Sequence, residues 1–413
     1  MPGAPYIVWG PELSPYLLKL ESMLSRAGLP MRRLPRDGSR LENLRTSLLV
    51  DAAKRRRTAR HPLGNDDLDE YPLVPFLITP DKEVLHDSSA LARWIDERTG
   101  SGATRLLPEV PEVPEVPDAR DLPAIRFLCS FLDEAFDEFG LYMVHHNRWK
   151  LAAGDNDHPG RRLAREYGRL LPPGAGPVFA RWFEKRQVRR LPYLFSVAPD
   201  GYRVTGLDAA LTPASRAGFP PTHRLLEQSW ERTLAAMEAI LAQQPYLLGN
   251  RFTLADASAY GQLSMNLTDT AAARRLGELA PRTLAWLGDI RDRRHVASTG
   301  PLSISPLLGA LLEVFFDTFV PLMRANEAAH ERWSSQGATV FNEKAFDAGI
   351  ALFDGDLLGH PYRSVAKTFQ VRVWRNLRRE WLSMARDERS RVASMLRGRD
   401  ADALLSTQLP ALS

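Results

Sequence analysis

The first hundred residues alternate between short apolar runs and longer amphipathic stretches. The short runs are typical of β-strands and lie at residues 5–10, 31–34, 75–79 and 84–86. The longer stretches have the spacing of amphipathic helices and lie at residues 15–27, 41–56 and 88–98. The resulting order is β-α-β, a polar segment that holds the second helix, and then β-β-α. One sheet with helices on both faces satisfies this order, so we expect an α/β domain.

A proline-rich repeat follows this first unit. From Pro108 to Pro117 a proline occupies every third position. Such spacing favours extended polyproline geometry and forms a semi-rigid spacer between domains. We therefore expect the first domain to span residues 1–105 and a linker to span residues 106–117. A ligand for SH3 or WW domains is the alternative interpretation of the repeat.

The chain beyond the linker is expected to be almost entirely helical. Helical periodicity is found at residues 124–149, 178–190, 225–243, 254–268 and 283–293. Residues 154–221 are irregular outside the second of these stretches and have the character of an insertion. These stretches predict a second, helical domain at residues 118–295.

The last part of the chain, residues 296–413, is too long and too apolar to be a disordered tail. Its apolar residues form seams with helical spacing. The clearest seams are Leu307-Leu311-Phe315 and Val365-Phe369-Val373. We therefore expect an extra helical block at the C-terminal end.

Composition argues against several classes of function. Apolar residues at 44% and charged residues at 25% are ordinary for a globular protein. The net charge of +4 is a small excess of 54 basic over 50 acidic residues, which does not favour a nucleic-acid partner. The start of the chain shows no hydrophobic signal, and no run of about 18 apolar residues could span a bilayer. We expect a soluble, cytoplasmic protein without a membrane partner.

Metal and redox chemistry find no support in the sequence. A single cysteine, Cys129, leaves no internal disulfide or CxxC pair, and its apolar surroundings favour a buried structural thiol. No HExxH motif or Cys/His grouping has the spacing of metal ligands, so no metal is expected. Glycine-rich phosphate loops and a GxSxG motif are also missing.

Five short segments occur in a characteristic order. They are Trp9-Gly-Pro-Glu-Leu-Ser-Pro-Tyr16, Val74-Pro75, Asp87-Ser88, residues 246–256 and residues 280–286. Together they resemble the cytosolic glutathione transferases, in particular the serine classes, over roughly residues 5–295. The resemblance implies a thioredoxin-like N-terminal domain, an all-α domain and a homodimer. The C-terminal block has no counterpart in ordinary members.

The resemblance also implies a role for each segment. Ser14 is implied as the catalytic hydroxyl, which stabilises the thiolate of the co-substrate glutathione. Val74 precedes Pro75, the position of the family's cis-proline, and would pair with the cysteinyl backbone. Asp87 and Ser88 would hold the γ-glutamyl end of the thiol.

The energetics of thiol ionisation agree with this role for Ser14. A free thiol has a pKa of about 8.5, and lowering it by about two units requires about 2.7 kcal/mol. One hydrogen bond to the charged sulfur contributes about 1.5–3 kcal/mol, and a helix N-terminus adds about 0.3–1 kcal/mol. The alternative is that Ser14 only caps the helix, with Pro15 at its first position.

The electrophile pocket is expected at the end of the first long helix of the α-domain and beside residues 9–16, which we call the serine loop. The residues expected to line it are Tyr16, Tyr142, His145 and Trp149. A surface or helix-end pair is the alternative interpretation of His145-His146. Thr253 and Asp256 are expected to form a capping box, and not a catalytic pair.

The residues favour activation of a small thiol, which then attacks an electrophilic, largely apolar small molecule. Conjugation, dehalogenation, ether cleavage and isomerisation are all compatible with this chemistry. Two alternatives stay open. One is a non-catalytic interaction module on the same fold, with the C-terminal block as a partner surface. The other is an enzyme that uses a different low-molecular-weight thiol, because the segment 36–70 that should contact the glycyl end is unusually long.

Overall fold

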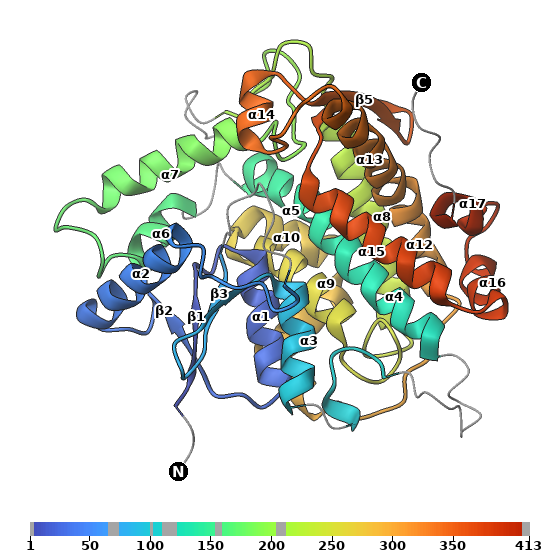
Figure 1. Ribbon diagram of the computed structural model, residues 1–413, viewed down its shortest axis with the longest axis horizontal. Helices are drawn as coiled ribbons and strands as arrows, with labels where there is room; N and C mark the ends of the chain where they lie inside the picture. Colours follow the sequence, from blue (N-terminus) through green and yellow to red (C-terminus); the bar gives the residue numbers. More distant parts are fainter. Residues whose placement is uncertain are drawn as a thin grey trace.

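The computed structural model describes residues 4–64, 74–99, 102–109, 122–152, 159–203 and 212–406 (Figure 1). The N-terminal part contains one sheet with the strand order β2-β1-β3-β4. Its strands are β1 (Tyr6–Trp9), β2 (Met31–Leu34), β3 (Phe76–Ile78) and β4 (Val84–His86). Strand β1 is parallel to β2 and antiparallel to β3, and β3 is antiparallel to β4.

Three helices cover this sheet on both faces. They are α1 (Pro15–Arg26), α2 (Arg40–Arg55) and α3 (Ser88–Thr99). Alternate strand residues point to opposite faces, so Val8 and Leu77 join the core with α1 and α3. Trp9 and Phe76 pack on the other face with Val50 of α2. The expected thioredoxin-like α/β domain is confirmed.

The second part of the chain is helical, as expected. Its helices are α4 (Leu122–Ala135), α5 (Leu141–Asn147), α8 (His223–Leu241), α9 (Leu254–Ser264), α10 (Thr270–Leu279) and α11 (Pro281–Arg291). Two π-helical turns, η3 (Phe136–Gly140) and η4 (Arg148–Ala152), interrupt the first long helix. The irregular segment contains α7 (Gly176–Arg190) and a helix that the sequence did not predict, α6 (Pro159–Glu166).

The capping box at the start of α9 is present. The Asp256 carboxylate accepts hydrogen bonds from the backbone N–H groups of Thr253 at 2.9 Å and Leu247 at 2.8 Å. Burial raises the pKa of Asp256 to about 7, against the hydrogen bonds that lower it. The pair fixes a chain turn and the start of a helix, as the sequence predicts.

The C-terminal block contains a β-hairpin as well as helices. Its elements are α12 (Leu308–Asp317), α13 (Phe319–Ser335), α14 (Glu343–Ala348), β5 (Leu352–Leu357), β6 (His360–Val365), α15 (Thr368–Ser383), α16 (Arg386–Ser394) and α17 (Ala401–Ser406). Val365 ends a strand, so the expected helical seam through Val365 and Phe369 is wrong. The two turn residues, Leu358 and Gly359, have φ of 55° and 77°, which is the geometry of a tight hairpin.

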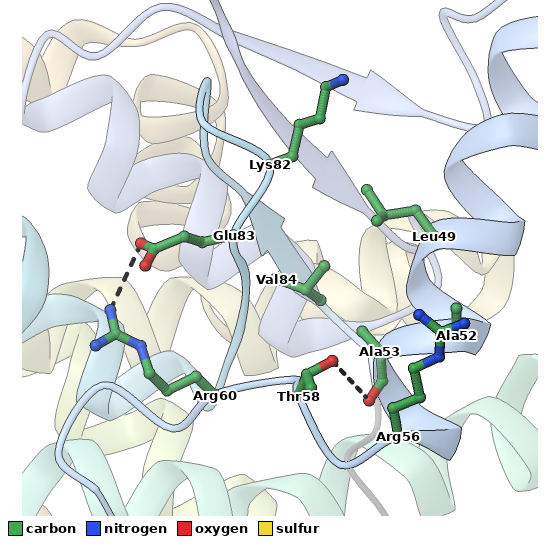
Figure 2. A pocket seen from close by; sticks show the side chains of 9 residues that line it. All are labelled: Leu49, Ala52, Ala53, Arg56, Thr58, Arg60, Lys82, Glu83 and Val84. Atoms are coloured by element: carbon green, nitrogen blue, oxygen red, sulfur yellow. Dashed lines mark hydrogen bonds and ion pairs between the residues drawn. The ribbon is translucent and has the colours of Figure 1, made fainter.

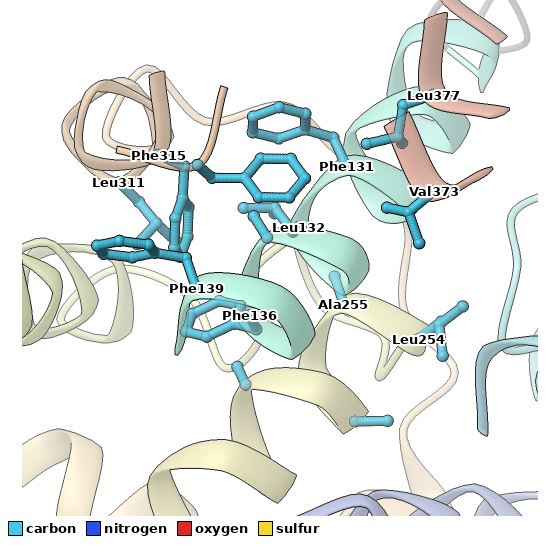
Figure 3. Close-up of a cluster of buried hydrophobic side chains, with 14 of the residues drawn as sticks. Phe131, Leu132, Phe136, Phe139, Leu254, Ala255, Leu311, Phe315, Val373 and Leu377 are labelled. Carbon is cyan, nitrogen blue, oxygen red and sulfur yellow. The ribbon is translucent and has the colours of Figure 1, made fainter. Parts of the chain in front are cut away.

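The C-terminal block shares one hydrophobic core with the two preceding parts. Figure 3 shows Phe131 of the first long helix between side chains of α12 and α15, and Phe136 on the side of α12, where its ring meets that of Phe315. The ring centroids of Phe131 and Phe316 lie 5.2 Å apart, and those of Phe127 and Trp381 lie 5.1 Å apart. The domain boundaries near residues 105, 117 and 295 stay predictions. Most of the proline repeat, residues 110–117, lies outside the described residues.

Cys129 is fully buried in α4. Burial raises the pKa of its thiol to about 12, so it stays protonated and unreactive at neutral pH. Within the described part of the chain, no helix combines the length and the apolar character needed to cross a bilayer.

Helices α1 and α9 approach one another closely at Gly261. A Cβ atom added at Gly261 would lie 2.6 Å from the backbone oxygen of Pro15 and 2.9 Å from Cβ of Lys19. Any side chain would therefore push α1 away from α9. This contact helps to set the position of α1 against the helical domain.

We predict that Gly261→Ala lowers the free energy of unfolding by about 1–3 kcal/mol, because the methyl group overpacks a contact with rigid backbone. Urea unfolding followed by circular dichroism measures the change. The matched control is Gly288→Ala in α11, where an added Cβ meets only the flexible end of Arg291 at 3.9 Å. The control is expected to gain about 0.5–1 kcal/mol from helix propensity. Equal effects of the two substitutions would contradict the packing argument.

Candidate functional site

The strand register brings three of the predicted segments to one end of the sheet. Trp9 pairs with Phe76, and Phe76 pairs with His86. The loop after β1, the residues before β3 and the residues after β4 therefore begin at the same edge. These are the serine loop, Val74-Pro75 and Asp87-Ser88.

The serine loop lies directly against Val74-Pro75. A Cβ atom added at Gly10 would lie 3.3 Å from Cβ of Val74 and 3.7 Å from Cα of Pro75. The peptide bond between Val74 and Pro75 is cis, as the resemblance implied. The backbone at Gly10 is thus packed against the proline that begins the turn into β3.

Ser14 occupies the N-cap position of α1, and Pro15 is the first helical residue. The backbone at Ser14 is extended, and only 9% of the residue is exposed. Its side chain makes no capping bond and no other hydrogen bond to any described residue. The hydroxyl is therefore not used as a helix cap, and it remains able to donate to a ligand at the positive end of α1.

Asp87 and Ser88 lie where β4 passes into α3. Asp87 has a φ of 75°, and its Oδ1 accepts a hydrogen bond of 2.9 Å from the backbone N–H of Ala90. Its Oδ2 lies 3.2 Å from Nε2 of His61 and 3.2 Å from Nη2 of Arg372. Burial alone would raise the pKa of Asp87, but these partners lower it to about 2, so the carboxylate is ionised at neutral pH.

The sequence analysis identified neither His61 nor Arg372. His61 lies in the polar segment between β2 and β3, which has no clear periodicity. Arg372 belongs to α15, 285 positions from Asp87 along the chain. A positively charged residue on an amphipathic helix is most often solvent-exposed, so no local signal pointed to this pair.

Both tyrosines of the expected electrophile pocket make interior hydrogen bonds. The Tyr16 hydroxyl donates to the backbone oxygen of Asp137 at 2.9 Å, and burial raises its pKa well above the usual value. The Tyr142 oxygen accepts from Nζ of Lys367 at 2.6 Å and from Nε2 of Gln370 at 3.0 Å. Tyr142 is 3% exposed. The C-terminal block therefore covers this part of the expected pocket wall.

His145 and Trp149 lie beside the insertion. Trp149 packs with Val188 and Leu191 at the end of α7. Burial, assisted by the charge of Arg148, lowers the pKa of His145 to about 3, so its imidazole is neutral. Trp149 is therefore buried against the end of α7, and His145 is half-buried.

The insertion also contacts the serine loop itself. Both carboxylate oxygens of Glu166, at the end of α6, accept from the backbone N–H of Glu12 at 3.0 and 3.2 Å. The rings of Tyr167 and Trp9 meet edge to face, with centroids 6.3 Å apart. No local pattern indicates these contacts, because Glu166 lies 154 positions from Glu12.

A buried ionic cluster holds α1 in place beneath the loop. Nζ of Lys19 lies 2.5 Å from the carboxylate of Asp133, 2.6 Å from that of Asp137 and 2.9 Å from Oγ of Ser89. Burial would lower the pKa of Lys19, but the two carboxylates outweigh it and raise the pKa. Two acidic pairs, Asp133-Glu134 and Asp137-Glu138, interrupt this apolar stretch four positions apart and are the only local signal of the cluster.

A pocket of about 270 Å³ lies at the other end of the sheet (Figure 2). It is formed between α2 and the start of β4, around Ala53, Arg56 and Val84. The Arg60 side chain turns toward Glu83, 3.5 Å away. This pocket includes none of the predicted site residues. Over the described ranges, no three His, Cys, Asp or Glu side chains are grouped so that they could hold a metal ion.

Comparison with known proteins gives one match to a family model. Residues 220–289, in the helical domain, match the model described as glutathione S-transferase, C-terminal domain. No curated protein sequence matches the chain.

Solved structures with some similarity are also found. A glutathione S-transferase-I bound with lactoylglutathione is 15% identical, covers 71% of this chain and 97% of its own, and has a TM-score of 0.37. Poplar glutathione transferase F1 is 16% identical, with coverages of 71% and 95% and a TM-score of 0.34. A glutathione S-transferase from Pseudomonas fluorescens is 17% identical, with coverages of 71% and 98% and a TM-score of 0.28. The fold assignment rests on the sheet topology and the family model.

We predict that Glu166 makes stability fall as pH rises from mildly acidic values toward neutrality. Burial raises its pKa to about 7, although the hydrogen bond from Glu12 and the charge of Arg33 lower it. The unfolded carboxyl titrates near 4.3. The folded protein therefore holds the extra proton between these values, and the stabilisation is lost as pH rises from about 4.5 to about 7.

Urea unfolding of the wild type and of Glu166→Gln across this pH range measures the effect. The stability of the variant relative to the wild type is expected to rise over this interval. Glu97→Gln, at an exposed position of α3, is the matched control and should give a flat difference. A flat difference for Glu166→Gln would contradict the elevated pKa.

Proposed function

We propose that this protein is a glutathione transferase-like enzyme that ionises glutathione at Ser14 for attack on an electrophilic small molecule. The observation that carries the proposal is the Ser14 hydroxyl. It lies at the N-terminus of α1 and makes no capping bond. Val74-Pro75 and Asp87-Ser88 lie at the same end of the sheet. The match of residues 220–289 to the glutathione S-transferase C-terminal family model supports the same assignment.

In the proposed mechanism the Ser14 hydroxyl donates a hydrogen bond to the thiolate, and its oxygen accepts none from the backbone N–H groups of its own helix. This bond and the N-terminus of α1 together contribute about 2–4 kcal/mol, which covers the cost of lowering a thiol pKa by about two units. The thiolate then attacks the electrophile without a side-chain base. Val74 and Pro75 would hold the cysteinyl backbone, and Asp87 with Ser88 would hold the γ-glutamyl end.

The second substrate is proposed to bind on the side of the helical domain. The residues proposed to line that side are Tyr16, Tyr142, His145 and Trp149. The same thiolate serves conjugation, dehalogenation, ether cleavage and isomerisation, so the reaction type is left open. We also propose that the protein is cytoplasmic and forms a homodimer.

A second candidate is an enzyme that uses a thiol other than glutathione. The observation that favours it is the occupied carboxylate of Asp87, which already faces His61 and Arg372. An α-ammonium group would have to share this carboxylate with two cationic or donor side chains. A thiol without that ammonium would meet no such competition.

We predict that Ser14→Ala lowers kcat/KM for glutathione by about 10- to 100-fold, because one hydrogen bond to a charged sulfur is lost. The pKa of bound glutathione should rise by about one to two units in the variant, as followed by the ultraviolet absorbance of the thiolate. Retention on immobilised glutathione should persist. Ser25→Ala, at the far end of the same helix, is the control and should leave all three quantities unchanged.

Turnover that survives Ser14→Ala undiminished would remove Ser14 from the mechanism. Retention of the wild type without turnover of any electrophile would favour the interaction module. Neither retention nor turnover with glutathione, together with turnover with another small thiol, would favour the second candidate.

A further inference from the structure

The start of α15 lies between the two walls of the candidate site. On one side, Nζ of Lys367 and Nε2 of Gln370 donate to the Tyr142 oxygen, and Gln370 also donates to Glu138 at 2.9 Å. On the other side, Arg372 contacts Asp87 at the start of α3. The C-terminal block therefore supplies a helix that bridges the thioredoxin-like part and the helical part at the site.

Arg372 has one guanidinium nitrogen that is not used by the protein. Nη2 contacts the Asp87 carboxylate at 3.2 Å, whereas Nη1 is buried and has no hydrogen-bond partner within the described ranges. The guanidinium carbon lies 4.9 Å from the ring centroid of Phe369, which restricts its position. A buried N–H group without an acceptor is unfavourable, so this nitrogen is suited to donate a hydrogen bond to a ligand anion.

The adjacent pair of Arg372 and Asp87 matches one chemical group well. An α-amino acid end carries a carboxylate and an ammonium on the same carbon, so it needs a cation and an anion side by side. The two side chains are 17% and 14% exposed, so the pair lies at a partly open edge. Ser88 and the N-terminus of α3 add donors for the same carboxylate.

We propose that Arg372 is a specificity-determining residue, which binds the free α-carboxylate of the thiol substrate while Asp87 binds the neighbouring α-ammonium. The inference rests on the proposed function and extends it. The C-terminal block thereby restricts the site to thiols that end in a free α-amino acid group. Arginine suits this role because its fork of N–H donors can bind Asp87 and a carboxylate at the same time.

A purely structural role for Arg372 would be to hold α15 against α3 without contacting a ligand. The structure provides a control that separates this role from ligand binding. A second ion pair, Arg93 with Glu380 at 3.3 Å, also joins α3 to α15. Removal of either pair weakens the contact between these helices. Only the pair at Asp87 lies at the candidate site.

The test measures binding of three S-methylated peptides to the full chain by isothermal titration calorimetry. The first is S-methylglutathione. The second carries 4-aminobutyrate in place of glutamate and lacks the α-carboxylate. The third carries glutarate there and lacks the α-ammonium. The proteins are the wild type, Arg372→Met, Arg372→Lys and the control Arg93→Met, each checked for folding by thermal unfolding.

We expect Arg372→Met to bind S-methylglutathione and the glutaryl peptide about 10- to 100-fold more weakly, and the aminobutyryl peptide as well as the wild type does. Arg372→Lys keeps the charge and should fall between the two. Arg93→Met should bind all three peptides as the wild type does, whatever its melting temperature.

Equal weakening for all three peptides in Arg372→Met, or no weakening, would overturn the role of Arg372 and leave the proposed function standing. If Arg372→Met does not fold, Arg372→Lys decides by the same comparison. Absence of binding of all three peptides to the wild type would overturn the proposed function and this inference together.

Discussion

The geometry of the candidate site depends on the buried contact of Lys19 with Asp133 and Asp137. Charges removed from water are costly unless they are paired at close range, and here one ammonium group faces two carboxylates and the Ser89 hydroxyl. Lys19 lies on α1, five residues after Ser14, and Ser89 follows Ser88 on α3. The cluster therefore holds the starts of both helices against α4, and the close approach at Gly261 leaves α1 little room to move.

Two segments outside the basic fold reach the site from opposite directions. The insertion places Glu166 on the backbone of the serine loop, and the C-terminal block places Arg372 on Asp87. In each contact a charged or titratable side chain of the extra segment bonds to a polar group of the site. Glu166 accepts from the backbone N–H of Glu12, and Arg372 pairs with the carboxylate of Asp87. The extra segments thus do more than enlarge the core. They place charged and titratable groups around the end of the sheet where the candidate site lies. These groups can change the charge of the site and the access of ligands to it.

Local signals in the sequence identified most of the regular elements. Strands β2 and β4 and the capping box of α9 lie where they were expected, and no end of α1, α2 or α3 differs from its expected position by more than one residue. The hairpin at β5 and β6 was missed because its apolar residues coincide with a helical spacing through Val365. The proline at Val74-Pro75 was located by resemblance, and its cis bond agrees with that expectation.

The sequence by itself determined the order of strands and helices in the N-terminal part and the position of Ser14 at a helix start, because periodicity and capping depend on neighbouring residues. Only the tertiary structure decided that the Ser14 hydroxyl makes no cap, that Asp87 faces Arg372, and that Tyr142 lies under the C-terminal block. The last two depend on contacts between residues far apart in the chain. Such contacts arise from the packing of whole elements, which the local pattern of side chains does not encode.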